Sequence, residues 1–288
     1  MSVSLESRPV AEQDFTINAL SPRLAAEVVG LDLRHPLRPS VRQAVYDAFV
    51  RYHVLCFRDQ TLTPDEQIAF TEQFGTLERH TLRNRGTGNP LVHTVTNLDA
   101  SGKPSGKVAS TRWHTDKSFR ELPSMATILH AIAMPPEGGD TLFADMEAAY
   151  DALPVDRKAA LDGVRVVHSW ELSLAKNGIT ISREEAADAP PMAHPLVRVH
   201  PDTGRRSLFM GEHASHFDGR PMEEGRAALA ELEAHATGEA FLYRHHWRPG
   251  DMLMWDNRCL LHRADPNFDA AFHPRVLHRT CLRGTTPA

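Results

Sequence analysis

The first part of the chain alternates helix-like and strand-like patterns of hydrophobic and polar positions. Over residues 40–51 the apolar side chains recur three or four positions apart, which predicts an amphipathic helix. Residues 53–57 form a short continuous apolar run, which predicts a buried strand. A second helix is predicted over 63–74, because Thr63 is a good N-cap, a proline follows it, and Glu66 completes a capping box.

The rest of the chain is dominated by short apolar runs separated by turn residues. Helical patterns over about 145–162 and 221–236 interrupt these runs, and Pro-Asp-Thr-Gly at 201–204 predicts a hairpin turn. Many short strands with few helices predict a mainly β fold, a sandwich or jelly-roll barrel with flanking helices outside. No repeat or linker divides the chain, so we expect one domain over 1–288. The expected strands are 126–133, 141–143, 164–168, 196–200, 207–210, 240–247, 252–255 and 276–283.

Residues 79–112 differ from their surroundings in composition. They are rich in Gly, Asn, Ser and Thr and carry six basic residues against one acid, Asp99. Two interpretations of this long basic connection are open. It is either a solvated loop or a lid loop that closes over an anionic ligand.

Composition excludes several classes of protein. Lys and Arg number 32 and Asp and Glu 37, so the formal net charge is −5, which argues against a nucleic-acid partner. The sequence has no apolar stretch long enough to span a membrane and no apolar leader at its start. Its three cysteines are far apart, which argues against a disulfide scaffold and fits a reducing, cytoplasmic location.

Histidine is abundant, with 17 residues, and it directs attention to metal binding. His114 and Asp116 are two positions apart, so in an extended segment both side chains point to one side and can hold one ion. The second such pair, His200 and Asp202, lies at the predicted hairpin turn and is assigned to turn chemistry. With His262 as a third ligand, His114 and Asp116 match the two-His, one-carboxylate pattern of non-haem Fe(II) oxygenases.

Two arginines near the C-terminal end add a candidate anion site. Arg275 and Arg279 are four positions apart and therefore share one side of a strand. On an inner face they need anionic partners, and a guanidinium suits a carboxylate because it offers paired parallel donors. The alternative is a pair of surface arginines on an edge strand.

Taken together, these motifs identify a family resemblance. The chain resembles the Fe(II)/2-oxoglutarate-dependent dioxygenases of the taurine dioxygenase and 2,4-dichlorophenoxyacetate dioxygenase (TauD/TfdA) family along nearly its whole length. The resemblance implies a double-stranded β-helix, a cupin-like jelly roll. The motifs that carry it are Phe74-Gly75-Thr-Leu, Trp113-His-Thr-Asp116, Gly138-Gly-Asp-Thr-Leu-Phe143, Asp145 to Pro154, Trp255-Asp-Asn257, His262 and Arg275 to Arg279.

The resemblance also implies roles for individual residues. Arg275 would pair with the distal carboxylate of 2-oxoglutarate, helped by the hydroxyl of Thr141. Arg279 would lie near the metal-bound end of that molecule and near the anionic group of the substrate. His80 falls where taurine dioxygenase has a histidine that contacts the substrate. Three residues would bind Fe(II): His114, Asp116 and His262.

The implied reaction is hydroxylation of a small organic anion with Fe(II), 2-oxoglutarate and O2, which releases succinate and CO2. Resemblance to the herbicide-degrading branch ranks aryloxyalkanoates first, with ether cleavage through a hemiacetal, and alkyl sulfonates or alkyl sulfates second. Two other classes remain open: a metal-dependent hydrolase and a non-enzymatic binding protein. The family suggests a homo-oligomer, a dimer or a tetramer.

Overall fold

The computed structural model describes residues 15–79, 89–176 and 178–288. Short strands predominate in these ranges, as the turn-rich sequence predicts. The helices are α1 (Pro39–Tyr52), α2 (Pro64–Glu72), α3 (Met146–Asp151), α4 (Val155–Leu161), α5 (Trp170–Ala175), α6 (Arg183–Asp188), α7 (Met222–Ala236) and the 3-10 helix η1 (Glu239–Phe241). The strands are β1 (Thr16–Ala19), β2 (Ala26–Val29), β3 (Val54–Phe57), β4 (His93–Thr96), β5 (Ser124–Ala133), β6 (Thr141–Asp145), β7 (Arg165–His168), β8 (Met192–Pro195), β9 (Val197–Val199), β10 (Arg206–Leu208), β11 (Ala214–Phe217), β12 (Leu242–His245), β13 (Met252–Asp256), β14 (Leu260–Ala264) and β15 (Val276–Arg283).

Seven strands form the largest sheet, in the order β1-β2-β3-β13-β5-β15-β4. Neighbouring strands run antiparallel, except that β2 and β3 are parallel. The central strands β13 and β5 are buried along most of their length, since both faces of the sheet are covered. A polar side chain here, such as the fully buried Thr127 of β5, therefore needs a hydrogen-bond partner inside the protein.

A three-stranded sheet, β12-β6-β14, packs against the inner face of the large sheet. The ring of His262, at the centre of β14, lies 4.7 Å from the ring of Trp255 on β13, so this candidate ligand projects into the space between the sheets. The arrangement is the predicted sandwich of short strands. Its shared core includes Leu129, Phe143, Leu253, Trp255, Leu260 and Leu277.

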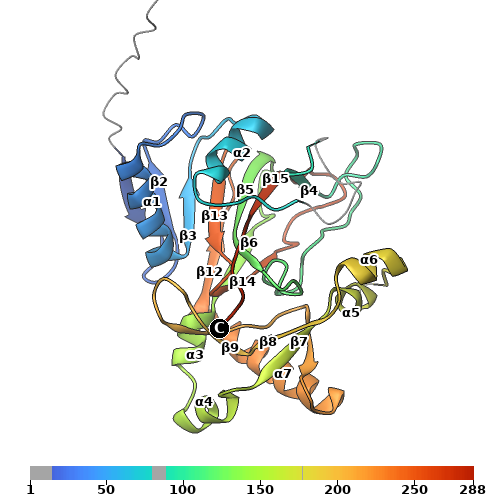
Figure 1. Cartoon of the computed structure of the whole chain (residues 1–288). Coiled ribbons are helices and arrows are strands. Elements are labelled where there is room, and N and C mark those ends of the chain that lie inside the picture. Colours follow the sequence, from blue (N-terminus) through green and yellow to red (C-terminus); the bar gives the residue numbers. More distant parts are fainter. Residues whose placement is uncertain (1–14, 80–88, 177) are drawn as a thin grey trace, which may run out of the picture.

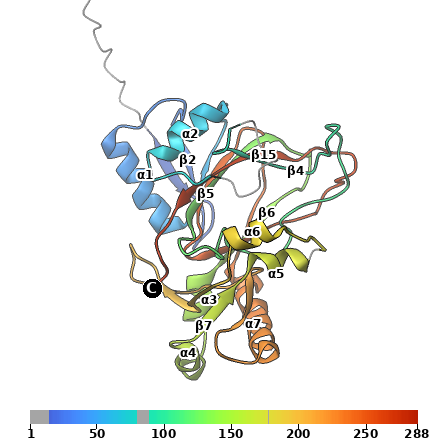
Figure 2. The same ribbon diagram turned by 45° about the vertical axis from the view of Figure 1, so that its right-hand side comes forward.

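Helices cover the outside of the sandwich at two places. Helices α1 and α2 pack on the outer face of the large sheet, where Phe49 and Phe70 join Leu55 and Met254 in one apolar cluster. Helices α3, α4 and α7 gather at the opposite end of the molecule (Figures 1 and 2). There they pack with the two small sheets β11-β7-β8 and β10-β9 around a second cluster. Among the described residues, no helix has the length and apolar character needed to cross a membrane.

Most of the predicted elements are present, including the capping box, in which Thr63 and Glu66 bond reciprocally at the start of α2. The prediction of one helix over 145–162 was wrong. Two helices, α3 and α4, occupy that range, because Pro154 stands between them and cannot continue the first. The connection 79–112 contains strand β4, which pairs with β15. Helices α5 and α6 had no counterpart in the prediction.

Candidate metal centre and co-substrate site

His114 and His262, distant in sequence, are joined by backbone hydrogen bonds. The His114 N–H donates to the His262 carbonyl at 3.0 Å, and the His262 N–H donates to the His114 carbonyl at 2.8 Å. This isolated bridge sets the two imidazoles side by side, with ring centroids 4.2 Å apart. Asp116 follows two residues later, and its Oδ2 lies 3.6 Å from Nε2 of His262. The structure thus brings together the three residues that the sequence singled out.

The donor atoms of this cluster suit a cation. One ligand atom from each of His114, Asp116 and His262 lies within 4.8 Å of the others, and all three side chains are buried. Nδ1 of His114 lies 2.8 Å from the carbonyl oxygen of Arg112. Because a carbonyl only accepts, Nδ1 carries the proton and Nε2 keeps a lone pair for a metal.

Electrostatics keep Asp116 and His262 in their metal-binding protonation states. Burial favours the neutral acid at Asp116, but Arg279, the two neighbouring imidazoles and the hydrogen bond from Thr127 together outweigh it and hold the pKa of Asp116 well below its usual range. Burial and the neighbouring His114 lower the pKa of His262 well below its usual value. An ionised carboxylate and a neutral imidazole are the forms that bind a metal.

Two other groups of potential ligands are already occupied by protein contacts. In the group of His53, His200, Asp256 and Cys259, Arg258 donates to both oxygens of Asp256, at 2.8 and 2.6 Å. In the group of Cys56, His245 and Asp251, burial raises the pKa of the Cys56 thiol, and Arg58 donates to Asp251 at 2.7 Å. Arginine thus occupies both carboxylate oxygens of the first group, and the thiol of the second group stays protonated, so neither group offers a cation a full set of free ligand atoms.

The pair His200 and Asp202 has the turn role assigned from the sequence. Nδ1 of His200 accepts the backbone N–H groups of Asp202 and Thr203, at 3.2 and 3.3 Å. These bonds close the turn between β9 and β10. Since Nδ1 accepts, the proton lies on Nε2, which donates to Asp256 at 3.0 Å. The prediction of turn chemistry is therefore confirmed.

Arg275 and Thr141 form a second, buried polar site. Nε of Arg275 donates to the Gly139 carbonyl at 2.9 Å, and its Nη2 donates to Oγ1 of Thr141 at 3.3 Å. Burial lowers the pKa of Arg275 to about 10, so the guanidinium remains charged at neutral pH. Among the described residues, no carboxylate accepts a hydrogen bond from the Arg275 guanidinium, and a buried cation of this kind suits an incoming anion.

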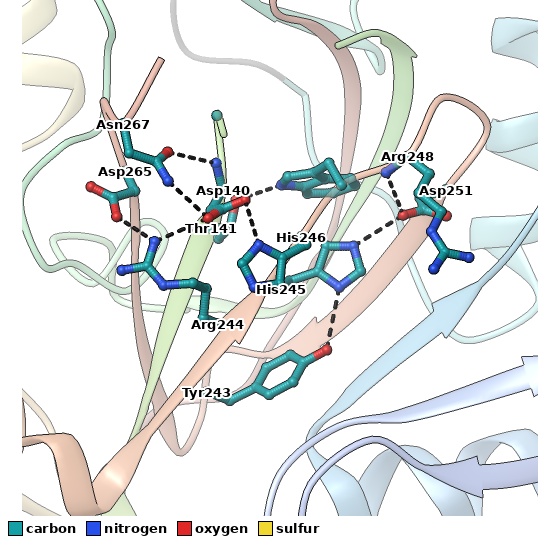
Figure 3. Close-up of polar contacts among 12 residues, drawn as sticks. Asp140, Thr141, Tyr243, Arg244, His245, His246, Arg248, Asp251, Asp265 and Asn267 are labelled. Atoms are coloured by element: carbon teal, nitrogen blue, oxygen red, sulfur yellow. Dashed lines mark hydrogen bonds and ion pairs between the residues drawn. The ribbon is translucent and has the colours of Figure 1, made fainter. Parts of the chain in front are cut away.

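A polar network fixes the backbone around Thr141 (Figure 3). Nε1 of Trp247 donates to Oγ1 of Thr141 at 2.9 Å. The neighbouring Asp140 accepts from Arg244 at 3.0 Å, from Asn267 at 2.9 Å and from His246 at 3.1 Å. These contacts tie the start of β6 to β12 and to the loop after β14, so the Thr141 hydroxyl has a fixed position.

The two sites lie on the same structural elements. Thr141 and Phe143 are two positions apart on β6, and the Phe143 ring stacks on the His262 ring at 6.2 Å. Arg279, four residues after Arg275, donates from Nη1 to Oδ1 of Asp116 at 3.1 Å. Strands β6 and β15 therefore connect the candidate co-substrate site to the candidate metal centre. His80, the remaining predicted site residue, lies outside the described residues.

Thr127, Asn257 and Trp247 also belong to these sites, and sequence reasoning assigned them no role. Asn257 lies in one of the motifs that carry the family resemblance, and Trp247 ends a predicted strand. Thr127 lies within an apolar strand and gives no local signal. Cross-strand pairing, which the sequence pattern does not specify, brings these three residues to the site.

Fold and site together define a jelly-roll protein with a buried His-Asp-His set of potential metal ligands beside a buried arginine that is a candidate anion site. A family model described as "Taurine catabolism dioxygenase TauD, TfdA family" matches residues 16–281. The chain belongs to this family, and it is a dioxygenase. The predicted mainly β, double-stranded β-helix fold with flanking helices is confirmed.

Similarity to individual proteins is strong along the chain. An alpha-ketoglutarate-dependent 2,4-dichlorophenoxyacetate dioxygenase of Cupriavidus pinatubonensis is 41% identical over 260 residues, covering 86% of this chain and 91% of the relative. An alpha-ketoglutarate-dependent sulfate ester dioxygenase of Pseudomonas putida is 30% identical over 289 residues, covering 95% and 91%. The solved structure of AAD-2 in complex with Mn(II) and N-oxalylglycine has a TM-score of 0.85 and 37% identity, covering 95% of this chain and 98% of that one.

Proposed function

We propose that this protein is an Fe(II)- and 2-oxoglutarate-dependent dioxygenase that hydroxylates an aryloxyalkanoate. The observation that carries the proposal is the buried set of His114, Asp116 and His262, which lies beside the buried pair of Arg275 and Thr141. A metal with three open positions and a nearby receptor for a dicarboxylate are what this chemistry requires.

His114, Asp116 and His262 would hold Fe(II) through Nε2, a carboxylate oxygen and Nε2. The bound metal supplies the activation of O2, which is coupled to decarboxylation of 2-oxoglutarate to succinate and CO2. The guanidinium of Arg275 and the hydroxyl of Thr141 bind the distal carboxylate of 2-oxoglutarate and set its orientation. Positioning and charge are therefore the contribution of the protein.

The proposed substrate is a small organic anion, for which Arg279 supplies the positive charge beside the metal centre. Hydroxylation of the carbon next to an ether oxygen gives a hemiacetal, which releases the phenol. The 41% identity to a 2,4-dichlorophenoxyacetate dioxygenase supports an aryloxyalkanoate. An alkyl sulfonate or alkyl sulfate is the alternative, supported at lower identity by the sulfate ester dioxygenase.

Two other classes of protein, a metal-dependent hydrolase and a non-enzymatic binding protein, explain fewer features of the site than a dioxygenase does. A metal-dependent hydrolase gives no role to Arg275, Thr141 and Arg279 together. A non-enzymatic binding protein gives no reason for three buried potential ligands, of which Asp116 has a lowered pKa that keeps it ionised and His262 a lowered pKa that keeps it neutral.

The proposal extends to the domain organisation, the segment 79–112, the oligomeric state and the location of the protein. The chain acts as one domain over 1–288, in which the segment 79–112 covers the metal centre and His80 contacts substrate. The carbonyl of Arg112 at His114, and the Asn97 side chain that accepts from the Arg275 N–H at 2.7 Å, support this placement. We also propose a homo-oligomer, a dimer or tetramer, in the cytoplasm, where its three free, buried cysteines stay reduced.

Replacement of a candidate ligand tests the proposal. With Fe(II), 2-oxoglutarate and an aryloxyacetate, we expect oxygen uptake and succinate formation by the wild type. Both fall to background in the His114→Ala variant, because two ligands cannot hold the metal. His35→Ala is the matched control, since that histidine is 68% exposed and far from the site in sequence.

Turnover retained by His114→Ala would contradict the ligand assignment. A panel of aryloxyacetates, aryloxypropionates, alkyl sulfonates and alkyl sulfates decides the substrate class. Oxygen uptake confined to the sulfur compounds would replace the aryloxyalkanoate by the alternative.

A further inference from the structure

Asp116 stands at the end of a chain of side-chain hydrogen bonds that starts at Trp255. Nε1 of Trp255 donates to Oδ1 of Asn257 at 3.1 Å. Nδ2 of Asn257 donates to Oγ1 of Thr127 at 2.9 Å, and the Thr127 hydroxyl donates to Oδ2 of Asp116 at 2.6 Å. Trp255, Asn257 and Thr127 are at most 1% exposed, and Asp116 is 5% exposed, so water does not compete for these bonds.

The chemistry of its members fixes the direction of this chain. An indole N–H donates and cannot accept, so the Asn257 atom facing Trp255 is the amide oxygen. The Asn257 amide nitrogen then faces Thr127, and the Thr127 oxygen accepts from it. The single hydroxyl proton of Thr127 is thereby directed to the Asp116 carboxylate.

The pairing of β5 with β13 brings the members of this hydrogen-bond chain together. Thr127 on β5 lies directly opposite Trp255 in the antiparallel pairing of β5 with β13. Residues opposite each other in such a pair point to the same face of the sheet. Asn257 follows the end of β13, and its carbonyl accepts from the Thr115 hydroxyl at 2.8 Å. Asn257 thus bonds both to Thr127 and to Thr115, which directly precedes Asp116 in the sequence.

Each oxygen of Asp116 is held by a different side chain. Thr127 bonds Oδ2, and Arg279 donates from Nη1 to Oδ1 at 3.1 Å. Two such bonds fix the plane of the carboxylate, while each oxygen retains a further acceptor site. A second acceptor near the Thr127 hydroxyl is the weakly accepting Sγ of Cys281, at 3.6 Å, so the carboxylate at 2.6 Å is the principal acceptor of its proton.

We propose that Thr127 and Asn257 are positioning residues that hold the Asp116 carboxylate in the orientation needed to bind the metal. The inference rests on the proposed function, which makes Asp116 a metal ligand. Residues that orient a ligand in this way affect metal affinity strongly although they do not touch the metal.

Metal affinity of the full-length, metal-free protein tests this inference without any turnover. Mn²⁺ is titrated into the wild type and the Thr127→Val and Thr127→Ser variants, and free Mn²⁺ is measured by electron paramagnetic resonance. Valine keeps the shape of threonine and removes the hydroxyl, so we expect the Kd to rise about 10- to 100-fold. Serine keeps the hydroxyl, so we expect an affinity close to that of the wild type.

The outcomes separate this inference from the proposed function. Absence of stoichiometric Mn²⁺ binding by the wild type, or binding retained by Asp116→Ala, would overturn the proposed function. Binding lost in Asp116→Ala but unchanged in Thr127→Val would overturn only the positioning role. Equal weakening in the valine and serine variants would overturn it too, because packing and not the hydroxyl would then be responsible.

A second variant keeps the test decisive if Thr127→Val does not fold. Asn257→Asp retains an acceptor for Trp255 but offers no N–H to Thr127. The introduced carboxylate competes with Asp116 for the one hydroxyl proton of Thr127, so we expect weaker Mn²⁺ binding in a chain that still contains this threonine. Unchanged affinity in a folded Asn257→Asp protein would contradict the inference.

Discussion

Tryptophan N–H groups, which donate but never accept, set the direction of hydrogen bonds at both candidate sites. Trp255 does so for the chain that ends at Asp116. Trp247 does so for Thr141, whose oxygen accepts from both Trp247 and Arg275. Both of these partners are donors only, so the Thr141 proton remains available to an incoming carboxylate.

This geometry makes the Thr141 hydroxyl a specific contact for 2-oxoglutarate. In Thr141→Val we expect the 2-oxoglutarate KM to rise about 10-fold or more, since a hydrogen bond to a charged group is lost. The kcat at saturating 2-oxoglutarate should change little. Succinate formation as a function of 2-oxoglutarate concentration measures both values. Thr141→Ser is the matched control, and a KM that is equal in the valine variant and the wild type would contradict the contact.

Single residues were predictable from the sequence where a motif carries them. His114, Asp116 and His262 form one buried group, and Arg275 lies in contact with Thr141, the residue predicted to assist it in binding 2-oxoglutarate. Thr127 was not predictable, because its partner is set by the register between β5 and β13 and not by its neighbours in sequence. Motifs therefore indicate the candidate metal ligands and the arginines, and they give no signal for Thr127, which we propose orients one of those ligands.

Among the structural elements, the segment between β10 and β11 supports the candidate metal centre through its backbone. Gly211 has a φ of 114°, a backbone conformation that residues with a side chain rarely adopt. A Cβ atom there would lie 3.0 Å from the Trp113 carbonyl oxygen and 3.1 Å from the Cα atom of His114. The same carbonyl accepts from the Glu212 N–H at 2.7 Å, so the two segments lie in direct contact.

Gly211→Ala should therefore displace His114 as well as strain its own backbone. We expect a loss of about 1–3 kcal/mol in stability and a weaker Mn²⁺ affinity. Gly163→Ala is the control, since Gly163 also has a left-handed φ, of 70°, but a Cβ there meets nothing within 4 Å. Urea unfolding and Mn²⁺ titration of both variants measure the two effects. Equal metal affinities in the two variants would show that contact with Gly211 does not position His114.

Most elements with strong local signals were predicted well, and those that depend on distant pairing were not. The capping box fixes the start of α2 as predicted. The break between α3 and α4 at Pro154 is the exception, because its signal is local and the prediction still ran one helix through it. Strand β14 was not predicted, because its short apolar run has no period of its own. Its pairing with β6 makes it a strand and gives His262 its direction.

At the scale of the whole molecule, a buried polar network joins parts that lie far apart in sequence. His53, at the end of α1, lies 3.6 Å from Glu147 on α3. Arg258, after β13, donates to Asp256 and, at 2.6 Å, to Asp202 of the β9–β10 hairpin. The network thus connects α1, α3 and the hairpin to the large sheet.

The His53 contact predicts a pH dependence of stability. Burial disfavours the charged imidazole, but Glu147 and Asp256 outweigh it and raise the pKa of His53. A raised folded-state pKa stabilises the protein below the ordinary value of about 6.5, and this stabilisation fades as the pH rises through the folded-state value.

We therefore expect the advantage of the wild type over His53→Gln to be largest in mild acid and to shrink above neutral pH. The free energy of unfolding in urea, measured for both proteins across this range, gives the difference. An advantage that grows with pH would show that His53 is buried as a neutral group.

The backbone bridge between His114 and His262 also has a consequence for how the protein assembles. It closes a very long loop, so the two imidazoles are neighbours in the native structure and are far apart along the denatured chain. A metal held by both rings therefore binds the native chain in preference to the denatured one. The fraction of folded protein therefore depends on the concentration of the metal ion. When the ion is scarce, fewer molecules are folded and fewer of the folded molecules carry the metal.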